Sequence, residues 1–319
     1  MRFFDELLAC PRCAGALLGL RCGACGRQYL APDGIPDLRI DADARTGAVR
    51  DFYAAAPFPG YPERDSVSGL RARAARSEFA RLLDAAIPGD AQVLEVGCGT
   101  GQLGLFLATA DRTVIGADLA RPSLELARAA AIRYGASARF VETDLRSPGL
   151  QRSAFDVVIC SGVLHHTPDP RASFASVAQL VRPGGVLVIG LYNAWARLPH
   201  RLRRAIFRLT GVAPFDPVLR ARRCEPARRE AWLRDQYLHP EEHRHTLREV
   251  RRWFSDNGVL YLRTFPSALF GEEAGDLFTQ AEDDWAPESL LSQLSWMRTL
   301  GGEGGLFAVM GMRTASPRA

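Results

Sequence analysis

A chain of 319 residues, 47% of them hydrophobic, is long enough for one large α/β domain and a smaller attached unit, each with its own core. Its 40 basic and 36 acidic residues leave a formal charge of +4, which argues neither for nor against a polyanionic partner. Every basic residue is arginine, and the absence of lysine excludes a Schiff-base lysine and the lysine of a phosphate-binding loop.

The first twenty residues do not have the layout of a signal peptide, because Asp5 and Glu6 precede a cysteine pair where a basic and then an apolar region would be required. No apolar run reaches the roughly 18 residues of a membrane span. We therefore expect a cytoplasmic protein. In a reducing compartment its seven cysteines favour metal ligation over a disulfide framework.

Residues 10–25 read CPRCAGALLGLRCGAC, two C-x-x-C pairs separated by eight residues. Four thiolates at this spacing can converge on one tetrahedral zinc from two short turns, whereas a redox C-x-x-C usually occurs singly on a βαβ unit. With the continuation RQYLAPDGIPDL, the pairs resemble the small zinc-ribbon activator subunits of tRNA and release-factor methyltransferases. The resemblance implies a structural zinc ribbon over residues 1–40, here fused in cis, with these ligands: Cys10, Cys13, Cys22 and Cys25.

The composition of residues 41–65 shifts to Ala, Asp, Arg and Pro, and prolines 57, 59 and 62 predict an extended backbone. Four aromatic residues lie close together here, more than a plain spacer needs: Phe52, Tyr53, Phe58 and Tyr61. Either they cover a ligand pocket of the main domain or they hold the ribbon against it. Residues 66–87 then have apolar positions at helical spacing, and Pro88 and Gly89 end this helix. The linker and leading helix thus span 41–90.

Residues 93–102 read VLEVGCGTGQ, a short apolar strand followed by a glycine loop over which a ligand can approach the backbone. A dinucleotide fingerprint would carry a third glycine where Gln102 stands, which argues against NAD. About twenty residues further, Asp118 ends a second apolar run, where a carboxylate can bind both hydroxyls of a ribose. Asp144 ends a third run.

This ordered set resembles the class I S-adenosylmethionine (SAM) methyltransferases, most closely the branch related to ubiquinone-biosynthesis enzymes, over residues 80–193. The resemblance implies a Rossmann-like seven-stranded α/β domain over residues 91–319 with SAM as cofactor. Glu95 and the glycine loop would lie near its methionine part, with Ser161 at the same end, Asp118 at the ribose, and Asp144 with Leu145 at the adenine. The full set of expected cofactor residues is Glu95, Gly97, Gly99, Gly101, Gln102, Asp118, Leu119, Asp144, Leu145 and Ser161.

The rest of the domain alternates helices with apolar strands typical of a buried parallel sheet. Helices are predicted at 102–110, 122–134 and 171–181, and the resembled fold implies that the last strand runs antiparallel. A capping box of Thr246 and Glu249 begins another helix that continues through 257. The predicted strands are 113–117, 138–142, 155–161, 185–192, 259–265 and 306–312.

FDVVICSGVLHHTPDP places two histidines after a strand, at the edge of the sheet where acceptor chemistry takes place. His165 or His166 could accept a proton from an acceptor hydroxyl or amine. The alternative is that they only shape the loop, since proximity alone can drive methyl transfer from a sulfonium.

Residues 196–234 hold eleven arginines and three acids, with an apolar stripe of Leu198, Leu202, Ile206, Phe207 and Leu209. They form the core of a basic insertion at about 194–246. Three interpretations stand: an RNA-binding face that includes Arg197, Arg201, Arg203, Arg204 and Arg208, a site for an anionic acceptor or a membrane surface, or a solvated arginine-rich face.

His239, His243 and His245 lie close together with Glu241 and Glu242, but their spacing matches no helical metal-ligand pair. An acceptor-site role for Tyr237 or His239 fits this segment better, because it should pass above the carboxyl edge of the sheet.

The sequence lacks the N-P-P-Y kind of signature that enzymes methylating amino groups of nucleic acids carry after their fourth strand. This absence favours a small-molecule acceptor. The alternatives are an RNA (tRNA or rRNA) or protein methyltransferase, and a non-catalytic SAM-binding regulator. A narrow apolar cavity would favour a small molecule, and an open arginine-lined groove would favour RNA.

Overall fold

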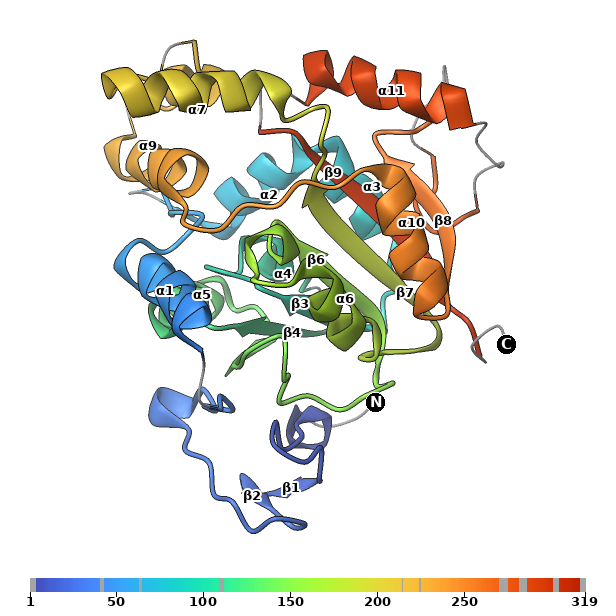
Figure 1. Ribbon diagram of the computed structural model, residues 1–319. Helices are drawn as coiled ribbons and strands as arrows, with labels where there is room; N and C mark the ends of the chain where they lie inside the picture. Colours follow the sequence, from blue (N-terminus) through green and yellow to red (C-terminus); the bar gives the residue numbers. More distant parts are fainter. Residues whose placement is uncertain are drawn as a thin grey trace.

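The computed structural model describes residues 4–40, 43–62, 65–108, 112–213, 215–223, 225–269, 275–280, 286–300 and 304–315. Cys224, residues 109 and 110 at the end of the helix predicted at 102–110, and parts of an acidic stretch at 272–288 lie outside these residues. A central sheet carries helices on both faces, and a small N-terminal unit packs below it (Figure 1).

The central sheet has seven strands in the order β5-β4-β3-β6-β7-β9-β8. Strands β3 to β7 pair in parallel, and β9 runs antiparallel to both β7 and β8. This confirms the predicted Rossmann-like methyltransferase sheet and its antiparallel last strand. The strands are β3 (Gln92–Val96), β4 (Thr113–Asp118), β5 (Ala138–Glu142), β6 (Phe155–Ser161), β7 (Val181–Tyr192), β8 (Val259–Phe265) and β9 (Leu306–Arg313).

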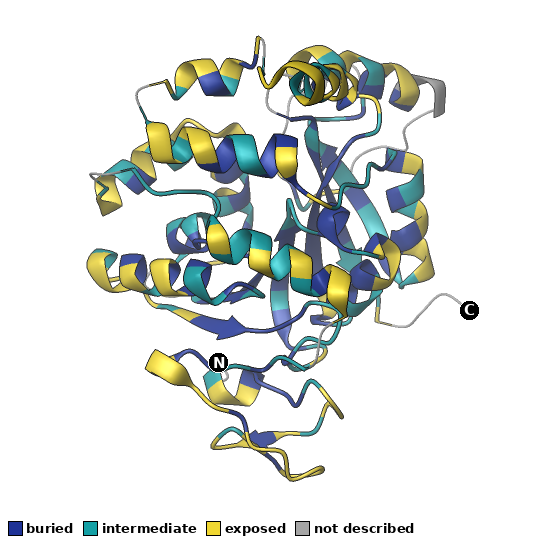
Figure 2. Ribbon diagram, turned by 60° about the vertical axis from the view of Figure 1, so that its left-hand side comes forward, coloured by how far each residue is buried: buried dark blue, intermediate teal, exposed yellow. Residues whose placement is uncertain are grey.

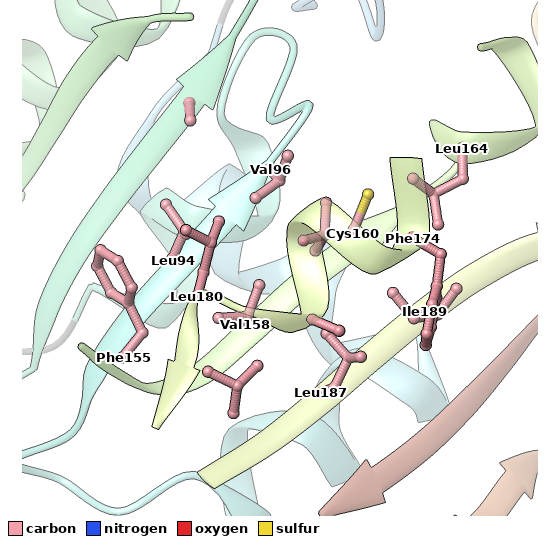
Figure 3. Close-up of a cluster of buried hydrophobic side chains, with 14 of the residues drawn as sticks. Leu94, Val96, Phe155, Val158, Cys160, Leu164, Phe174, Leu180, Leu187 and Ile189 are labelled. Carbon is pink, nitrogen blue, oxygen red and sulfur yellow. The ribbon is translucent and has the colours of Figure 1, made fainter. Parts of the chain in front are cut away.

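Alternate residues of the strands enter two separate cores, because successive side chains of a strand point to opposite faces. On one face, Leu94, Val158 and Leu187 pack against α6 (Pro170–Ala178) and α10 (Leu247–Asp256), and Figure 3 shows the part of this cluster around Phe174. On the other face, Val93 and its neighbours pack against α3 (Glu78–Ala86) and α4 (Gln102–Leu107). Figure 2 shows the outcome: the strands are buried and the outer helix faces are exposed.

The helix predicted at 66–87 is two helices, α2 (Val67–Ala75) and α3. The side chain of Ser77 accepts a hydrogen bond from Ala80 N and begins α3 as a new helix. Further along, α5 (Arg121–Tyr134) ends at Gly135, which has a left-handed φ of 63°. Of the two hydrogen bonds of the capping box predicted for α10, one is present: the Thr246 side chain accepts from Glu249 N. The Glu249 carboxylate pairs with His245 instead of the backbone of Thr246.

The N-terminal unit is built from short elements, namely η1 (Phe4–Leu7), β1 (Leu17–Leu18), β2 (Arg21–Cys22) and η2 (Pro32–Gly34). Its last segment pairs with the edge of the central sheet: Leu38 N donates to Glu142 O at 2.8 Å, and Glu142 N donates to Pro36 O at 2.9 Å. Leu7, Leu8 and Leu38 belong to the same hydrophobic cluster as β3 and β6. The unit therefore covers the otherwise free edge of β5.

The first half of the predicted extended linker is a helix, α1 (Ala44–Ala55). Asp43 caps it by accepting from Thr46 N at 2.9 Å, and the three prolines begin only after the helix has ended. The extended backbone predicted from these prolines holds for the residues around them but not for 44–55. Phe52 and Tyr53 therefore project from a helix, whereas Phe58 and Tyr61 lie on extended chain.

The basic insertion consists of α7 (Leu198–Thr210), α8 (Pro217–Ala221), α9 (Pro226–Leu233) and a π-helical segment, Arg234–Leu238. Together with α11 (Ala286–Thr299) it forms the upper part of the molecule in Figure 1. Among the described residues, no helix is both long and apolar enough to cross a bilayer.

Candidate functional site

A cavity of about 430 Å³ opens at the carboxyl ends of β3, β4 and β6, where open α/β sheets bind their ligands. Its floor comes from the sheet, including Glu95, Asp118 and Ser161. Its cover comes from α1, the proline-rich segment and the basic insertion. Of the expected cofactor residues, those that line the cavity are Glu95, Gly97, Gly99, Gln102, Asp118, Leu119, Asp144, Leu145 and Ser161.

The glycine loop has a left-handed backbone at Gly97, Gly99 and Gly101. A Cβ on Gly99 would come within 2.2 Å of the Phe58 carbonyl oxygen, so this glycine admits the cover segment. Gly101 does not line the cavity. A Cβ there would meet the Ala127 methyl group at 2.9 Å, so Gly101 serves the packing of α4 against α5.

Glu95 lines the cavity, but its carboxylate bonds to the backbone of α4: Oε2 accepts a hydrogen bond from Gly104 N at 2.9 Å. That amide is one of the free N–H groups in the first turn of α4. Burial raises the pKa of Glu95 to about 8. This residue therefore fixes the loop-to-helix junction.

The Asp118 carboxylate accepts from Gly99 N and from Ala120 N, both at 2.8 Å, and so connects the glycine loop to the end of β4. Burial raises its pKa, and these N–H donors act against the rise. Because a carboxylate has about four acceptor positions, two backbone donors leave capacity for ligand hydroxyls.

The Asp144 carboxylate is already paired: Arg146 Nη2 lies 2.8 Å from its Oδ2. The same guanidinium forms an ion pair with Asp43, the cap of α1. Arg146 thus ties helix α1 to the end of β5.

The aromatic and proline-rich segment covers the cavity, which decides between the two predicted roles. Tyr53, Phe58 and Pro59 line it, and backbone and side-chain bonds fasten the segment to the glycine loop. Thr100 Oγ1 donates to Pro59 O at 2.6 Å, and Tyr61 Oη donates to Thr100 O at 2.6 Å.

The two candidate histidines differ. His165 is fully buried, does not line the cavity and has no partner for either ring nitrogen; burial holds its pKa well below the ordinary value. It packs against Tyr192, with 3.8 Å between the ring centroids.

His166 lines the cavity, and its Nδ1 lies 2.7 Å from Glu241 O. A carbonyl only accepts, so Nδ1 carries the proton and Nε2 keeps its lone pair. Burial lowers the pKa of His166 to about 4.

Sequence reasoning missed one acid of the cavity. Asp235 lines the cavity from the π-helical segment, is buried, and accepts hydrogen bonds from Tyr53 and from Gln236. Burial raises its pKa. No clear signal for it is present in the sequence, because Asp235 stands between Arg234 and Gln236 in an arginine-rich segment. The residues considered instead do not line the cavity: Tyr237 donates to Asp216, and His239 stacks on His166.

The arginines of the insertion do not line the cavity. Arg146 is the arginine among its described lining residues, and it is paired as above. Arg197, expected on an exposed RNA-binding face, is fully buried and donates to Gln236 Oε1 and Gly304 O, both at 2.6 Å. Arg204 pairs with Glu242. A five-arginine outer face is therefore wrong, because Arg197 and Arg204 point inward.

The four N-terminal cysteines come together with their sulfur atoms all within 4.8 Å of one another. The Sγ atoms of Cys13 and Cys22 are 3.5 Å apart, and those of Cys10 and Cys25 are 3.7 Å apart. A tetrahedral zinc with bonds of about 2.3 Å requires sulfurs about 3.8 Å apart, so the cluster fits this metal. In the described part of the chain it is the one group of metal-ligating side chains this close; His239, His243 and His245 form no such group.

Comparisons with known proteins agree with this geometry. Residues 93–185 match the family model described as a methyltransferase domain. This segment is a methyltransferase domain. The match contains the glycine loop, Asp118, Asp144 and both candidate histidines, of which only His166 lines the cavity.

Individual proteins are also similar to this chain in sequence. An uncharacterised protein of Synechococcus sp. is 30% identical over 267 residues, 72% of this chain and 64% of the relative. A ubiquinone biosynthesis O-methyltransferase of Cronobacter sakazakii is 36% identical over 107 residues, 33% of this chain and 44% of the relative. The chain thus spans less than two thirds of the length of these relatives.

Among solved structures, a chain from the complex between the Haloferax volcanii Trm112 methyltransferase activator and a methyltransferase is similar in fold. The alignment has a TM-score of 0.50 and 17% identity, and it covers 85% of this chain and all of the other. At this identity the similarity shows the fold alone.

Proposed function

We propose that this protein is a SAM-dependent methyltransferase that acts on a small molecule. The observation that carries the proposal is that one covered cavity joins the glycine loop and Asp118 to Tyr53, Trp232 and Asp235, which we assign to the acceptor side. When bound, SAM supplies an activated methyl group on a sulfonium. The chain itself has to position that group, orient the acceptor and exclude water.

The cofactor side is formed by residues of the methyltransferase domain. Asp118 has acceptor capacity for the two ribose hydroxyls, and Leu119 and Leu145 supply apolar contact for the adenosine. Gly97 and Gly99 leave the backbone open to the methionine part, and Ser161 borders the same end. Gln102 donates from Nε2 to Pro59 O at 3.2 Å, so its role is to hold the cover in place.

The acceptor side is aromatic and carries two groups that can accept a hydrogen bond, the Asp235 carboxylate and Nε2 of His166. Either can orient an acceptor hydroxyl or amine and take the proton released when its oxygen or nitrogen is methylated. The inward pairing of Arg146, Arg197 and Arg204 leaves no free arginine among the described residues that line this cavity. A second hollow, of about 640 Å³, is lined by Arg220, Arg223 and Arg229, but it lies in the insertion and shares no lining residue with the cavity that contains the glycine loop. This favours a small molecule over RNA.

The N-terminal unit is proposed to be a structural zinc ribbon that supports the domain in cis. Its cysteines fit one tetrahedral metal, and its last segment extends the central sheet at β5. A closed four-cysteine site stabilises a unit too small for a core of its own.

Binding and turnover test this function separately. Calorimetry with S-adenosylhomocysteine should show one site per chain, weakened in Asp118→Ala and unchanged in Asp51→Ala, an exposed acid outside the cavity. Tritiated SAM is then incubated with protein and a cell extract that has been separated into small-molecule, RNA and protein fractions. Label should enter the small-molecule fraction. Label in RNA or protein would overturn the acceptor class, and cofactor binding without any transfer would indicate a regulator.

A further inference from the structure

Helix α7 of the insertion carries a stripe of apolar side chains that are exposed on the surface of the protein. Leu198, Leu202 and Leu209 recur on one side of the helix, and Leu202 and Leu209 are 66% and 87% exposed. The stripe continues beyond both ends of α7 through three more exposed residues: Trp195, Val212 and Phe215. We call these six residues the α7 stripe.

The opposite side of α7 is the one that packs inward, so the stripe is not a packing face. Phe207 contacts Tyr237, with 5.1 Å between ring centroids, and His200 Nε2 lies 3.0 Å from Gln236 O. Arg204 pairs with Glu242 on this same inner side. The sequence pattern predicted one apolar face, but the structure divides it between a half-buried part, Ile206 and Phe207, and the exposed leucines.

Positive charge borders the stripe. Arg201 and Arg208 are exposed on α7, where each directly precedes a leucine of the stripe, and no ion pair with either occurs in the described part of the chain. Arg220, Arg223 and Arg229 are further exposed arginines of the insertion. Glu230 is the one exposed acid among its described residues.

An apolar stripe beside unpaired arginines fits an anionic lipid surface. A helix of this kind lies in the plane of the bilayer interface, with its leucines among the acyl chains and its arginines at the headgroups. RNA would use the arginines but would leave Leu202 and Leu209 in water, so the charge and the apolar area together favour lipid. We propose that α7 and its flanking residues dock this protein on the surface of membranes that contain anionic lipids.

This surface lies outside the cavity, so the proposal does not depend on the methyl acceptor. The two are connected by the insertion, which also supplies Trp232 and Asp235 to the cavity. Docking through α7 would therefore hold the acceptor side of the site beside the bilayer.

Vesicle co-sedimentation of the full chain tests the proposal. The wild type should bind vesicles of phosphatidylcholine mixed with phosphatidylglycerol, bind phosphatidylcholine alone much more weakly, and lose binding as salt is raised. Leu202→Glu/Leu209→Glu should reduce binding roughly tenfold or more, because it removes the largest apolar contacts and adds two charges that the surface repels. Arg201→Gln/Arg208→Gln should reduce the preference for the anionic vesicles.

The matched control is Leu126→Glu/Ile132→Glu, which changes two exposed apolar residues of α5 in the same way. It should bind like the wild type. Melting temperature and S-adenosylhomocysteine binding check that each variant is folded, and Leu202→Ser/Leu209→Ser replaces the glutamate pair if it is not.

Three outcomes would overturn the proposal. The first is that the wild type does not bind anionic vesicles. The second is that both double-glutamate variants lose binding equally. The third is that the α7 stripe joins two copies of the chain, seen as a dimer in solution that Leu202→Glu/Leu209→Glu converts to monomer.

Discussion

The phenol of Tyr53 donates a hydrogen bond to the carboxylate of Asp235, with 2.8 Å between Oη and Oδ1. Asp235 Oδ2 in turn accepts from Gln236 Nε2 at 2.8 Å, and this amide also donates to Tyr192 Oη at 2.7 Å. The chain of bonds joins α1, the insertion and the end of β7 across the cavity. Two segments remote in sequence are thus held together over the site by one buried polar network.

Tyr53→Phe should therefore destabilise the protein by about 1 to 3 kcal/mol, because it leaves a buried carboxylate oxygen without its donor. Urea unfolding at neutral pH measures the loss. Tyr134→Phe is the matched control: its phenol also donates to a carboxylate, that of Asp65, but away from the cavity. Only the Tyr53 variant should also weaken S-adenosylhomocysteine binding. Equal effects of both variants on binding would contradict a role of the network in the site.

Glu95 should tolerate glutamine but not alanine. Its raised pKa of about 8 means that the carboxyl is mostly protonated at pH 7, and a glutamine side-chain oxygen can still accept from Gly104 N. Glu95→Gln should cost less than about 1 kcal/mol of stability, and Glu95→Ala about 1 to 3 kcal/mol, since it leaves a buried N–H unsatisfied. Thermal and urea unfolding compare them; equal losses in both variants would show that the hydrogen bond is not the cause.

Asp118→Ala should weaken cofactor binding by roughly 1.5 to 3 kcal/mol, the scale for hydrogen bonds to a charged group. The variant also frees the amides of Gly99 and Ala120, so the loop loses an anchor at the same time. Calorimetry with S-adenosylhomocysteine gives the affinity. Asp118→Asn, which keeps one side-chain oxygen, should fall between the wild type and the alanine variant. Unchanged affinity in Asp118→Ala would remove this residue from the site.

His166 should make the protein less stable in mild acid. Its pKa is lowered to about 4 in the folded protein and is about 6.5 in the unfolded chain, so the unfolded state binds more protons between these values. The stabilisation that the neutral His166 ring gives to the folded state is complete above pH 6.5. As the pH falls toward 4 it is lost, and the free energy of unfolding decreases by about 1.4 kcal/mol per pH unit. The difference in unfolding free energy between wild type and His166→Gln should shrink over this window. A difference independent of pH would be inconsistent with a buried neutral imidazole.

One zinc per chain should be bound by Cys10, Cys13, Cys22 and Cys25. Elemental analysis of Cys22→Ser/Cys25→Ser should show its loss, while Cys160→Ala, which removes a buried core cysteine, should retain it. Removal of the metal with a chelator should lower the melting temperature of the whole chain, because the unit shares a hydrophobic cluster with the sheet. Stoichiometric zinc in the double-serine variant would exclude this cluster as the ligand set.

The sheet was predictable from sequence because its strands are short apolar runs bounded by glycine or polar residues. The strand predicted at 259–265 has those bounds in the structure, Asp118 is the last residue of β4, and Asp144 follows β5. Helix α1 was not predictable in this way. Its alanines and arginines form no apolar stripe, and it is held by partners distant in sequence, including Asp235 for Tyr53 and Glu241 for Arg45.

Charge counting could not distinguish the arginines of the insertion. Arg197 and Arg201 belong to the same basic run, but Arg197 is enclosed by Gln236, Glu242 and the Tyr192 ring, whereas Arg201 is exposed. His165 and His166 differ for a similar reason: the backbone directs one ring into the core and the other into the cavity. Composition records how many charges a segment has, and only tertiary contacts decide which of them reach solvent.

The backbone pairing of residues 36–38 with Glu142 has a consequence for the protein in the cell. A bare β5 would present a row of unpaired amides and carbonyls, a template on which another strand could add. Fusion keeps the protecting segment at a permanently high local concentration, so the sheet does not depend on the supply of a separate subunit. Loss of the proposed zinc would loosen this unit and expose the edge of β5, so removal of the metal would promote association between chains as well as lower stability.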